Sequence, residues 1–123
     1  MRLENVILDD DLRPVAVLDW EMASLGAAEH DLAWLTTLQA TQDALVGRTV
    51  DGFLAVDEVI ATYEARLGRP VRDLAWYEAL AALRTTAILT RIAHLNEQRG
   101  EPNFFPIADN PIVDRLRALT EGR

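Results

Sequence analysis

Two short runs of aliphatic residues near the start of the chain are separated by a polar segment. Val6-Ile7-Leu8 and Val15-Ala16-Val17-Leu18 lie on either side of an aspartate-rich loop at 9–14 that contains a proline. Runs of this kind, bounded by polar turn residues, are typical of β-strands. The pattern therefore predicts a β-hairpin. A two-stranded hairpin is only marginally stable alone, so this one is expected to need support from another part of the fold.

Helical periodicity replaces the strand pattern in the next part of the chain. Apolar residues recur at helical spacing over 29–38. Leu32, Leu35 and one flank of Trp34 would share a face of this helix. The polar stretch 39–43 and the glycines that follow it are expected to form an irregular connection.

Two further segments carry clear signals for the start of a helix. Asp57 is a suitable N-cap for a helix over 58–67, and Gly68 follows as its stop signal. Near the C-terminus, Asn110 and Pro111 open a last short helix, because a proline at the first helical position costs no hydrogen bond.

The longest helical segment begins after Asp73, runs to about Gln98 and ends at Gly100. Its apolar residues at helical spacing are expected to form one buried face: Leu74, Tyr77, Leu80, Ala81, Ile88, Ile92 and Leu95. Arg84 and Arg91 lie one heptad apart on the same helix. They are expected to belong to a solvated face, and a groove for an anionic group such as phosphate is the alternative.

Together these elements predict a mainly α fold, with one N-terminal β-hairpin followed by a helical bundle. The 123 residues suffice for a single domain, in which 1–21 form the hairpin part and 22–123 the helical part.

Charge and composition narrow the classes of partner. The chain has 20 acidic and 12 basic residues, a net charge of −8, and every basic residue is an arginine. This acidic balance disfavours nucleic acids and anionic membranes, because both need clustered positive charge. The lack of cysteine and of any long apolar run predicts a soluble, cytoplasmic protein.

Asn5 and Asp19 are the residues with the clearest chemical interest. Asn5 begins the first expected strand and Asp19 follows the second, so an antiparallel hairpin brings both to the same end. An amide oxygen and a carboxylate are the hard oxygen ligands that suit Mg²⁺. Glu21 shares the side of Asp19 if the strand continues. From these residues alone, a solvated turn carboxylate is the simpler interpretation of Asp19.

Few other residues offer candidate chemistry. His30 and His94 are the only histidines, too few for a histidine-rich metal site. A contact near a helix start is expected for His30, and a favourable interaction with a helix C-terminus for His94. Phe104 and Phe105 adjoin a proline in a loop, where one of them is a candidate for a pocket cover or an association surface.

The order of these motifs resembles the C-terminal lobe of the aminoglycoside phosphotransferase and choline kinase-like family. The branch that it resembles most consists of small-molecule kinases related to the phosphotransferase domains fused to acyl-CoA dehydrogenases. The resemblance is dense over 2–35 and looser over 58–95. It rests on Leu3-Glu4-Asn5-Val6-Ile7-Leu8, Val15-Ala16-Val17-Leu18-Asp19-Trp20-Glu21, Leu25-Gly26 and Asp31-Leu32-Ala33-Trp34, and further along on Thr62-Tyr63-Glu64, Gly68 and Trp76-Tyr77-Glu78-Ala79.

The resemblance implies roles for four residues. Asn5 matches the asparagine that ends the family's His-Gly-Asp-x-x-x-x-Asn loop and would hold Mg²⁺. Asp19 matches the aspartate that bridges Mg²⁺ to the phosphates of ATP or GTP. Glu21 would support this site without binding the metal directly. Asp31 matches an aspartate that hydrogen-bonds the backbone of the catalytic loop, which is a structural role.

Departures from the family pattern limit the expected activity. The catalytic aspartate of that loop would fall immediately before Met1, and the nucleotide-binding N-terminal lobe is not represented. The chain has no lysine to contact the α- and β-phosphates. Gly26-Ala27-Ala28 stands where the family often has Gly-Asp-Pro. We therefore expect this chain to be inactive alone and to bind neither Mg²⁺ nor nucleotide tightly.

Two functional hypotheses follow. The first is part of an enzyme that transfers the γ-phosphate of ATP or GTP to the hydroxyl of a small molecule. The second is a non-catalytic helical module that forms a homodimer or docks on a separate N-terminal lobe, because the hairpin should expose an apolar edge.

Overall fold

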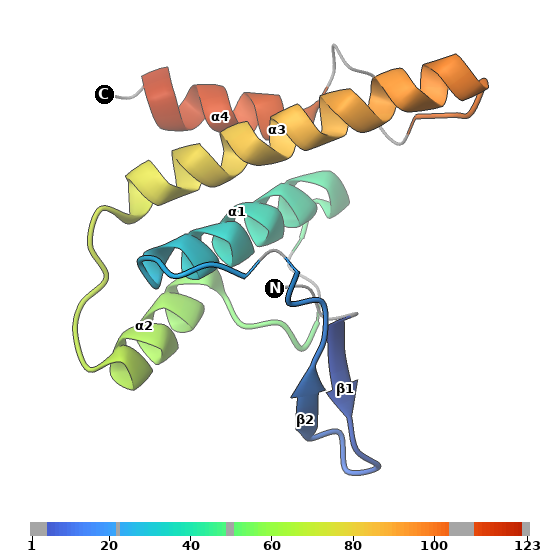
Figure 1. Ribbon diagram of the computed structural model, residues 1–123. Coiled ribbons are helices and arrows are strands. Elements are labelled where there is room, and N and C mark those ends of the chain that lie inside the picture. Colours follow the sequence, from blue (N-terminus) through green and yellow to red (C-terminus); the bar gives the residue numbers. More distant parts are fainter. Residues whose placement is uncertain (1–4, 22, 49–50, 104–109, 122–123) are drawn as a thin grey trace.

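The computed structural model describes residues 5–21, 23–48, 51–103 and 110–121. Within these ranges the chain forms a hairpin followed by four helices. In chain order the elements are β1 (Val6–Leu8), β2 (Pro14–Val17), α1 (Glu29–Val46), α2 (Val56–Leu67), α3 (Leu74–Arg99) and α4 (Pro111–Glu121). Figure 1 shows α1 and α3 side by side, with α2 packed on α1 and α4 on α3. The mainly α fold with one N-terminal hairpin is confirmed.

The hairpin forms where the two aliphatic runs predict it. β1 and β2 pair antiparallel, with Val6 opposite Val17. The Asp9 carboxylate closes the loop, because its Oδ1 accepts hydrogen bonds from the backbone N–H groups of Asp11, at 3.0 Å, and Arg13, at 2.8 Å. The hairpin projects away from the helices (Figure 1), and most of its residues are exposed.

The first helix is longer than its apolar pattern predicts. The expected irregular connection at 39–43 is wrong, because α1 continues through it to Val46. Tertiary contacts stabilise these polar residues within the helix. The Gln39 side-chain amide is buried and donates to the carbonyl of Leu54 at 2.6 Å. Gly47, at φ 75°, then ends the helix in the left-handed conformation that favours glycine.

The second helix starts two residues before the predicted position. Its N-cap is Ala55, so the expected cap at Asp57 is wrong. Glu58 explains the earlier start, because its Oε2 accepts a hydrogen bond of 3.0 Å from the backbone N–H of Ala55. This is the backbone half of a capping box. The predicted stop at Gly68 is confirmed.

The bounds of α3 match the prediction, but its buried face matches only in part. Asp73 precedes the helix and Gly100 ends it. Ile88 and Ile92 were expected to be buried, yet each is 45% exposed, and Leu95 is 37% exposed. Ala81 is buried as predicted, and the other buried residues of α3 are Glu78, Ala82, Thr85 and Ala93.

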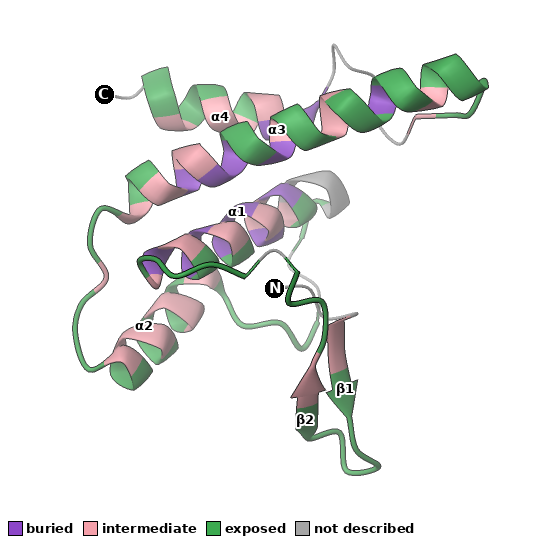
Figure 2. Cartoon of the chain, in the orientation of Figure 1, coloured by how far each residue is buried: buried purple, intermediate pink, exposed green. Residues whose placement is uncertain are grey.

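Small side chains form the centre of the helical bundle. Figure 2 shows the buried residues along the facing sides of α1 and α3. Ala33, Thr36 and Thr37 of α1 and Ala81 and Ala82 of α3 are each 0% exposed. Such residues let two helix backbones approach closely. Among the described residues, Leu32 and Ile112 are the larger aliphatic side chains that are also buried.

The C-terminal helix begins at the predicted proline. The Asn110 side chain is buried, and its Oδ1 accepts from the backbone N–H of Ile112 at 3.0 Å. This is the hydrogen bond of an N-cap. Phe104 and Phe105 lie outside the described residues. No helix within the described ranges is long and apolar enough to cross a membrane.

Candidate functional site

Asn5 and Asp19 meet at the open end of the hairpin, as the strand pairing predicts. The backbone N–H of Leu18 donates to the carbonyl of Asn5 at 2.7 Å and holds the two chain segments together. Beyond this bond, the Asn5 side-chain Nδ2 donates to Asp19 Oδ2 at 2.9 Å. Asn5 is half-buried and Asp19 is exposed. The fold therefore places an amide and a carboxylate side by side from opposite ends of the hairpin sequence.

The backbone of Asp19 is held in an unusual conformation. Its φ is 63°, in the left-handed region that aspartate tolerates better than most residues other than glycine. The neighbouring Trp20 is 68% exposed, and its indole N–H donates to the carbonyl of Val17 at 2.6 Å. This bond holds the chain in a tight turn at the strand end. Strained backbone of this kind is often found at functional sites.

The pair fits the coordination chemistry of Mg²⁺. Because Asn5 donates through nitrogen to one carboxylate oxygen, the amide Oδ1 and the second carboxylate oxygen remain as acceptors. Mg²⁺ commonly takes one or two protein oxygens and completes its shell with water and phosphates. Within the described ranges no group of three or more histidine, aspartate or glutamate side chains could hold a metal by itself. The pair thus leaves oxygen acceptors of the kind that Mg²⁺ binds.

Glu21 and Asp31 lie in different surroundings from this pair. Glu21 is exposed in the turn after Asp19, and Asp31 is exposed in the first turn of α1. Neither is hydrogen-bonded to Asn5 or Asp19. The supporting role of Glu21 and the structural role of Asp31 stay predictions.

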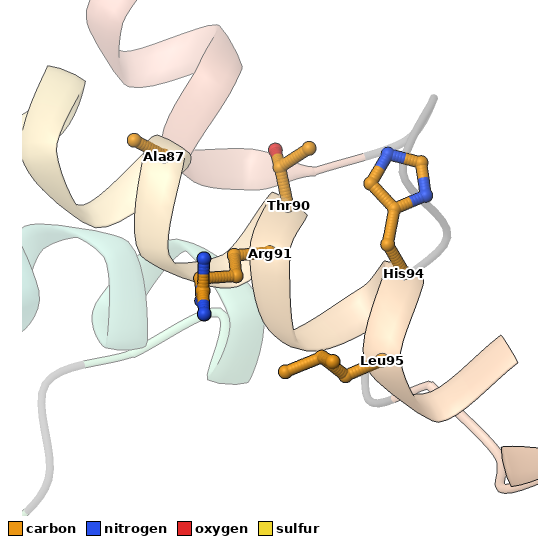
Figure 3. Close-up of a pocket in the computed structure, with 5 residues that line it drawn as sticks. All are labelled: Ala87, Thr90, Arg91, His94 and Leu95. Atoms are coloured by element: carbon orange, nitrogen blue, oxygen red, sulfur yellow. The ribbon is translucent and has the colours of Figure 1, made fainter. Parts of the chain in front are cut away.

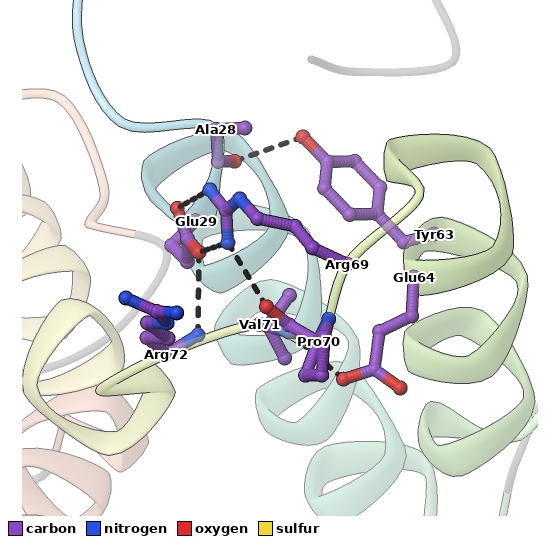
Figure 4. A network of polar contacts seen from close by, with 8 residues as sticks. All are labelled: Ala28, Glu29, Tyr63, Glu64, Arg69, Pro70, Val71 and Arg72. Atoms are coloured by element: carbon purple, nitrogen blue, oxygen red, sulfur yellow. Dashed lines mark hydrogen bonds and ion pairs between the residues drawn. The ribbon is translucent and has the colours of Figure 1, made fainter.

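Among the residues that the structure describes, the most connected carboxylate is Glu29, at the start of α1. Its side chain is 3% exposed and forms a two-oxygen ion pair with Arg69, in which Arg69 Nη2 donates to Oε2 at 3.1 Å (Figure 4). The backbone N–H of Arg72 donates to Oε1 at 3.2 Å. Glu29 therefore ties the first turn of α1 to the segment between α2 and α3.

The ion pair shifts the pKa values of its own two members. Hydrogen bonding to Arg69 lowers the pKa of Glu29 to about 2 and raises that of the Arg69 guanidinium. Nearby, Tyr63 donates its hydroxyl to the carbonyl of Ala28 at 2.9 Å (Figure 4). Burial, together with the negative charges of Asp31 and Glu29, raises the pKa of Tyr63.

A second buried carboxylate joins three helices. Glu78 of α3 accepts from the hydroxyl of Thr36 in α1 at 2.7 Å and pairs with Arg115 of α4 at 3.3 Å. Nothing in the sequence pattern indicated the roles of Glu29, Arg69 and Glu78. Their partners lie between 37 and 42 positions away in the chain, so no local periodicity could reveal these pairs.

The two histidines make surface contacts near opposite ends of their helices. His30 Nε2 lies 2.9 Å from Arg84 Nη1, and His94 Nδ1 lies 3.5 Å from Glu97 Oε2. The expected contact of His30 near a helix start is thus present. Arg84 is not simply solvated, because it contacts a side chain of α1.

A shallow depression on α3 lies apart from the Asn5–Asp19 pair and from the buried carboxylates Glu29 and Glu78. It has a volume of about 580 Å³ and is lined by Ala87, Thr90, Arg91, His94 and Leu95. Figure 3 shows that these side chains all project from α3 alone. No residue of the hairpin lines the depression, so it does not extend the Asn5–Asp19 pair.

Comparison with known families places the hairpin and its site within a matched region. The family described as the phosphotransferase enzyme family, APH, matches residues 1–80. The match covers the hairpin, α1, α2 and the start of α3, and therefore includes Asn5 and Asp19. It spans 80 of the 123 residues, more than half of the chain. The chain belongs to the phosphotransferase enzyme family.

Proposed function

We propose that this chain supplies the metal-binding half of a kinase-like phosphotransferase, which moves the γ-phosphate of ATP or GTP to the hydroxyl of a small molecule. The observation that carries the proposal is the 2.9 Å contact between Asn5 and Asp19, inside the region matched by the family. In this reading Asn5 and Asp19 are the two protein ligands of Mg²⁺.

Each residue contributes a different property to the site. Asp19 provides negative charge, and Asn5 provides a neutral oxygen while its N–H group orients the Asp19 carboxylate. Bound Mg²⁺ would neutralise charge on the nucleotide phosphates. Because the pair is open to solvent and supplies only two side chains, we expect weak metal binding in the absence of nucleotide.

The 123-residue chain by itself is expected to be inactive. It contains no lysine to contact the α- and β-phosphates and no His-Gly-Asp sequence to supply a catalytic aspartate. A phosphotransfer assay with ATP, GTP and a panel of small alcohols and aminosugars should therefore show no turnover above background. Turnover by the wild-type chain that the Asp19→Asn variant abolishes would contradict this expectation.

Paramagnetic Mn²⁺ offers a direct test of the metal site, because it replaces Mg²⁺ and broadens nearby NMR signals. We expect selective broadening of the Asn5 side-chain amide and of the backbone N–H groups of residues 18–20. The Asp19→Asn variant should lose this broadening. Asp10→Asn is the matched control, since Asp10 is an exposed aspartate in the loop of the same hairpin. Equal broadening in wild type and Asp19→Asn would overturn the proposed site.

A self-associating module is the second candidate function. The observation that favours it is the exposure of apolar hairpin side chains: Leu12 is 76% exposed and Val15 is 61% exposed. A second copy of the chain could pair with the open edges of this hairpin. Sedimentation velocity at low micromolar concentration tests this function, and a single monomeric species would contradict self-association.

A further inference from the structure

Arg84 occupies a fixed position between two aromatic side chains of α1. Its Nη1 lies 2.9 Å from His30 Nε2, and its Cζ lies 5.8 Å from the centre of the Trp34 ring. Since arginine can only donate, His30 Nε2 must accept, and the neutral ring carries its proton on Nδ1. A hydrogen bond and a cation–π contact thus orient the Arg84 guanidinium.

The ion pairs of the described residues leave Arg84 without a carboxylate. Five of the ten described arginines form ion pairs, among them Arg69 with Glu29 and Arg115 with Glu78, and Arg84 is one of the five that do not. Arg84 instead spends one of its five N–H donors on a neutral ring and is exposed. Among the described arginines that form no ion pair, Arg84 is the one whose guanidinium is oriented by contacts with other side chains.

Aromatic side chains extend from this cation along the start of α3. The ring of Tyr77 lies 6.2 Å from that of His30, centre to centre. Trp76 packs edge-on against Tyr77 at 4.9 Å and is itself 51% exposed. The rings therefore form a row from Trp76 through Tyr77 to His30, the residue that contacts the guanidinium, and Trp76 is the exposed member of the row. Figure 1 shows that the two contributing helices, α1 and α3, lie side by side.

We propose that Arg84, supported by His30 and Trp34, binds a small molecule with two parts. One part is a carboxylate or a phosphate monoester, and the other is an aromatic or apolar group. A planar guanidinium fork matches two oxygens of a carboxylate or phosphate. The neighbouring rings stack on the apolar part of the same ligand. The site uses neither Asn5 nor Asp19, so it stands or falls independently of the proposed metal site.

The test is an NMR titration of the ¹⁵N-labelled chain with phenyl phosphate and, separately, with benzoate. Saturable shifts of the Trp34 indole N–H and of backbone signals around His30 and Arg84 are expected with at least one of them. The tighter ligand identifies which head group the site prefers. Benzyl alcohol, which has the ring but no charge, should bind at least tenfold more weakly in the same titration. If neither anion gives saturable shifts, or if the alcohol matches them, the proposal is overturned.

Substitutions separate a specific site from general attraction to positive charge. Arg84→Gln should weaken binding about tenfold or more, which is the loss expected for a bidentate charged contact. Arg84→Lys keeps the charge but not the planar fork, so it should restore only part of the affinity. Arg91→Gln removes the same charge one heptad away on an exposed face of α3 and should leave binding unchanged. Equal losses in Arg84→Gln and Arg91→Gln would overturn the proposal. Circular dichroism checks that each variant is folded. If Arg84→Gln does not fold, the affinity of Arg84→Lys decides the question.

Discussion

Glu29 and Arg69, which are 40 positions apart in the chain, form an ion pair through both oxygens of a carboxylate that is almost fully buried. The pair joins the start of α1 to the segment after α2, in the region matched by the phosphotransferase family. It therefore ties the first turn of α1 to the segment that leads into α3.

This pair should make stability depend on pH in the acid range. The folded pKa of Glu29 is about 2, against an ordinary value of 4.5, so the unfolded chain binds the proton more readily. The stabilisation is complete above pH 4.5 and is lost as the pH falls towards 2. Urea unfolding should show Glu29→Gln to be less stable than wild type at pH 7, with a difference that shrinks between pH 4.5 and 2.

The control for this prediction is Asp114→Asn. Asp114 also pairs with an arginine, Arg117, but both side chains are mostly exposed, at 70% and 64%. Exposed pairs of this kind contribute little to stability. A difference between Glu29→Gln and wild type that stays constant from pH 7 to pH 2 would show that the carboxylate charge is not the cause.

The hydroxyl of Thr36 should be needed for the junction of three helices at Glu78. Thr36→Val keeps the shape of the side chain but removes the donor of the 2.7 Å hydrogen bond to the buried carboxylate. We expect the free energy of unfolding to fall by about 1–3 kcal/mol, the usual cost of leaving a buried polar group without its partner. Thr62→Val, at an exposed position of α2, should change it by less than about 0.5 kcal/mol. Equal effects in denaturant titrations would count against the role given to Glu78.

The close approach of α1 and α3 should not tolerate a larger side chain. Ala82 is 0% exposed, so Ala82→Leu must push the two helices apart or strain their side chains. A loss of about 1–3 kcal/mol in the free energy of unfolding is expected. Ala87→Leu adds the same atoms on the exposed side of α3 and should be close to neutral. Thermal and denaturant unfolding of the two variants provide the comparison.

Gly68 should be required by its backbone conformation and not by lack of space. Its φ is 71°, and a Cβ atom there would meet nothing within 4 Å. Gly68→Ala should therefore cost about 1–2 kcal/mol through the left-handed conformation alone. Gly26 has equally open surroundings without a positive φ, so Gly26→Ala should be neutral or slightly stabilising. A stability loss in both variants, measured by denaturant unfolding, would contradict this explanation.

Local signals were sufficient for the hairpin and for most helix ends. The aliphatic runs around Asp9, the stop at Gly68 and the proline at the start of α4 act through neighbouring residues, so they can be read along the chain. The convergence of Asn5 and Asp19 was also predictable, because strand pairing in a short hairpin is itself local.

The sequence by itself therefore determined the helical class, the hairpin and the position of its candidate metal ligands. Only the tertiary structure decided which faces are buried and which charges pair. Ile88 stays largely exposed because small residues on another side of α3 let α1 approach, and Gln39 stays helical because it reaches Leu54. Glu29 finds Arg69 for the same reason: contacts between residues far apart in the chain depend on how the helices pack, and no local pattern records that packing.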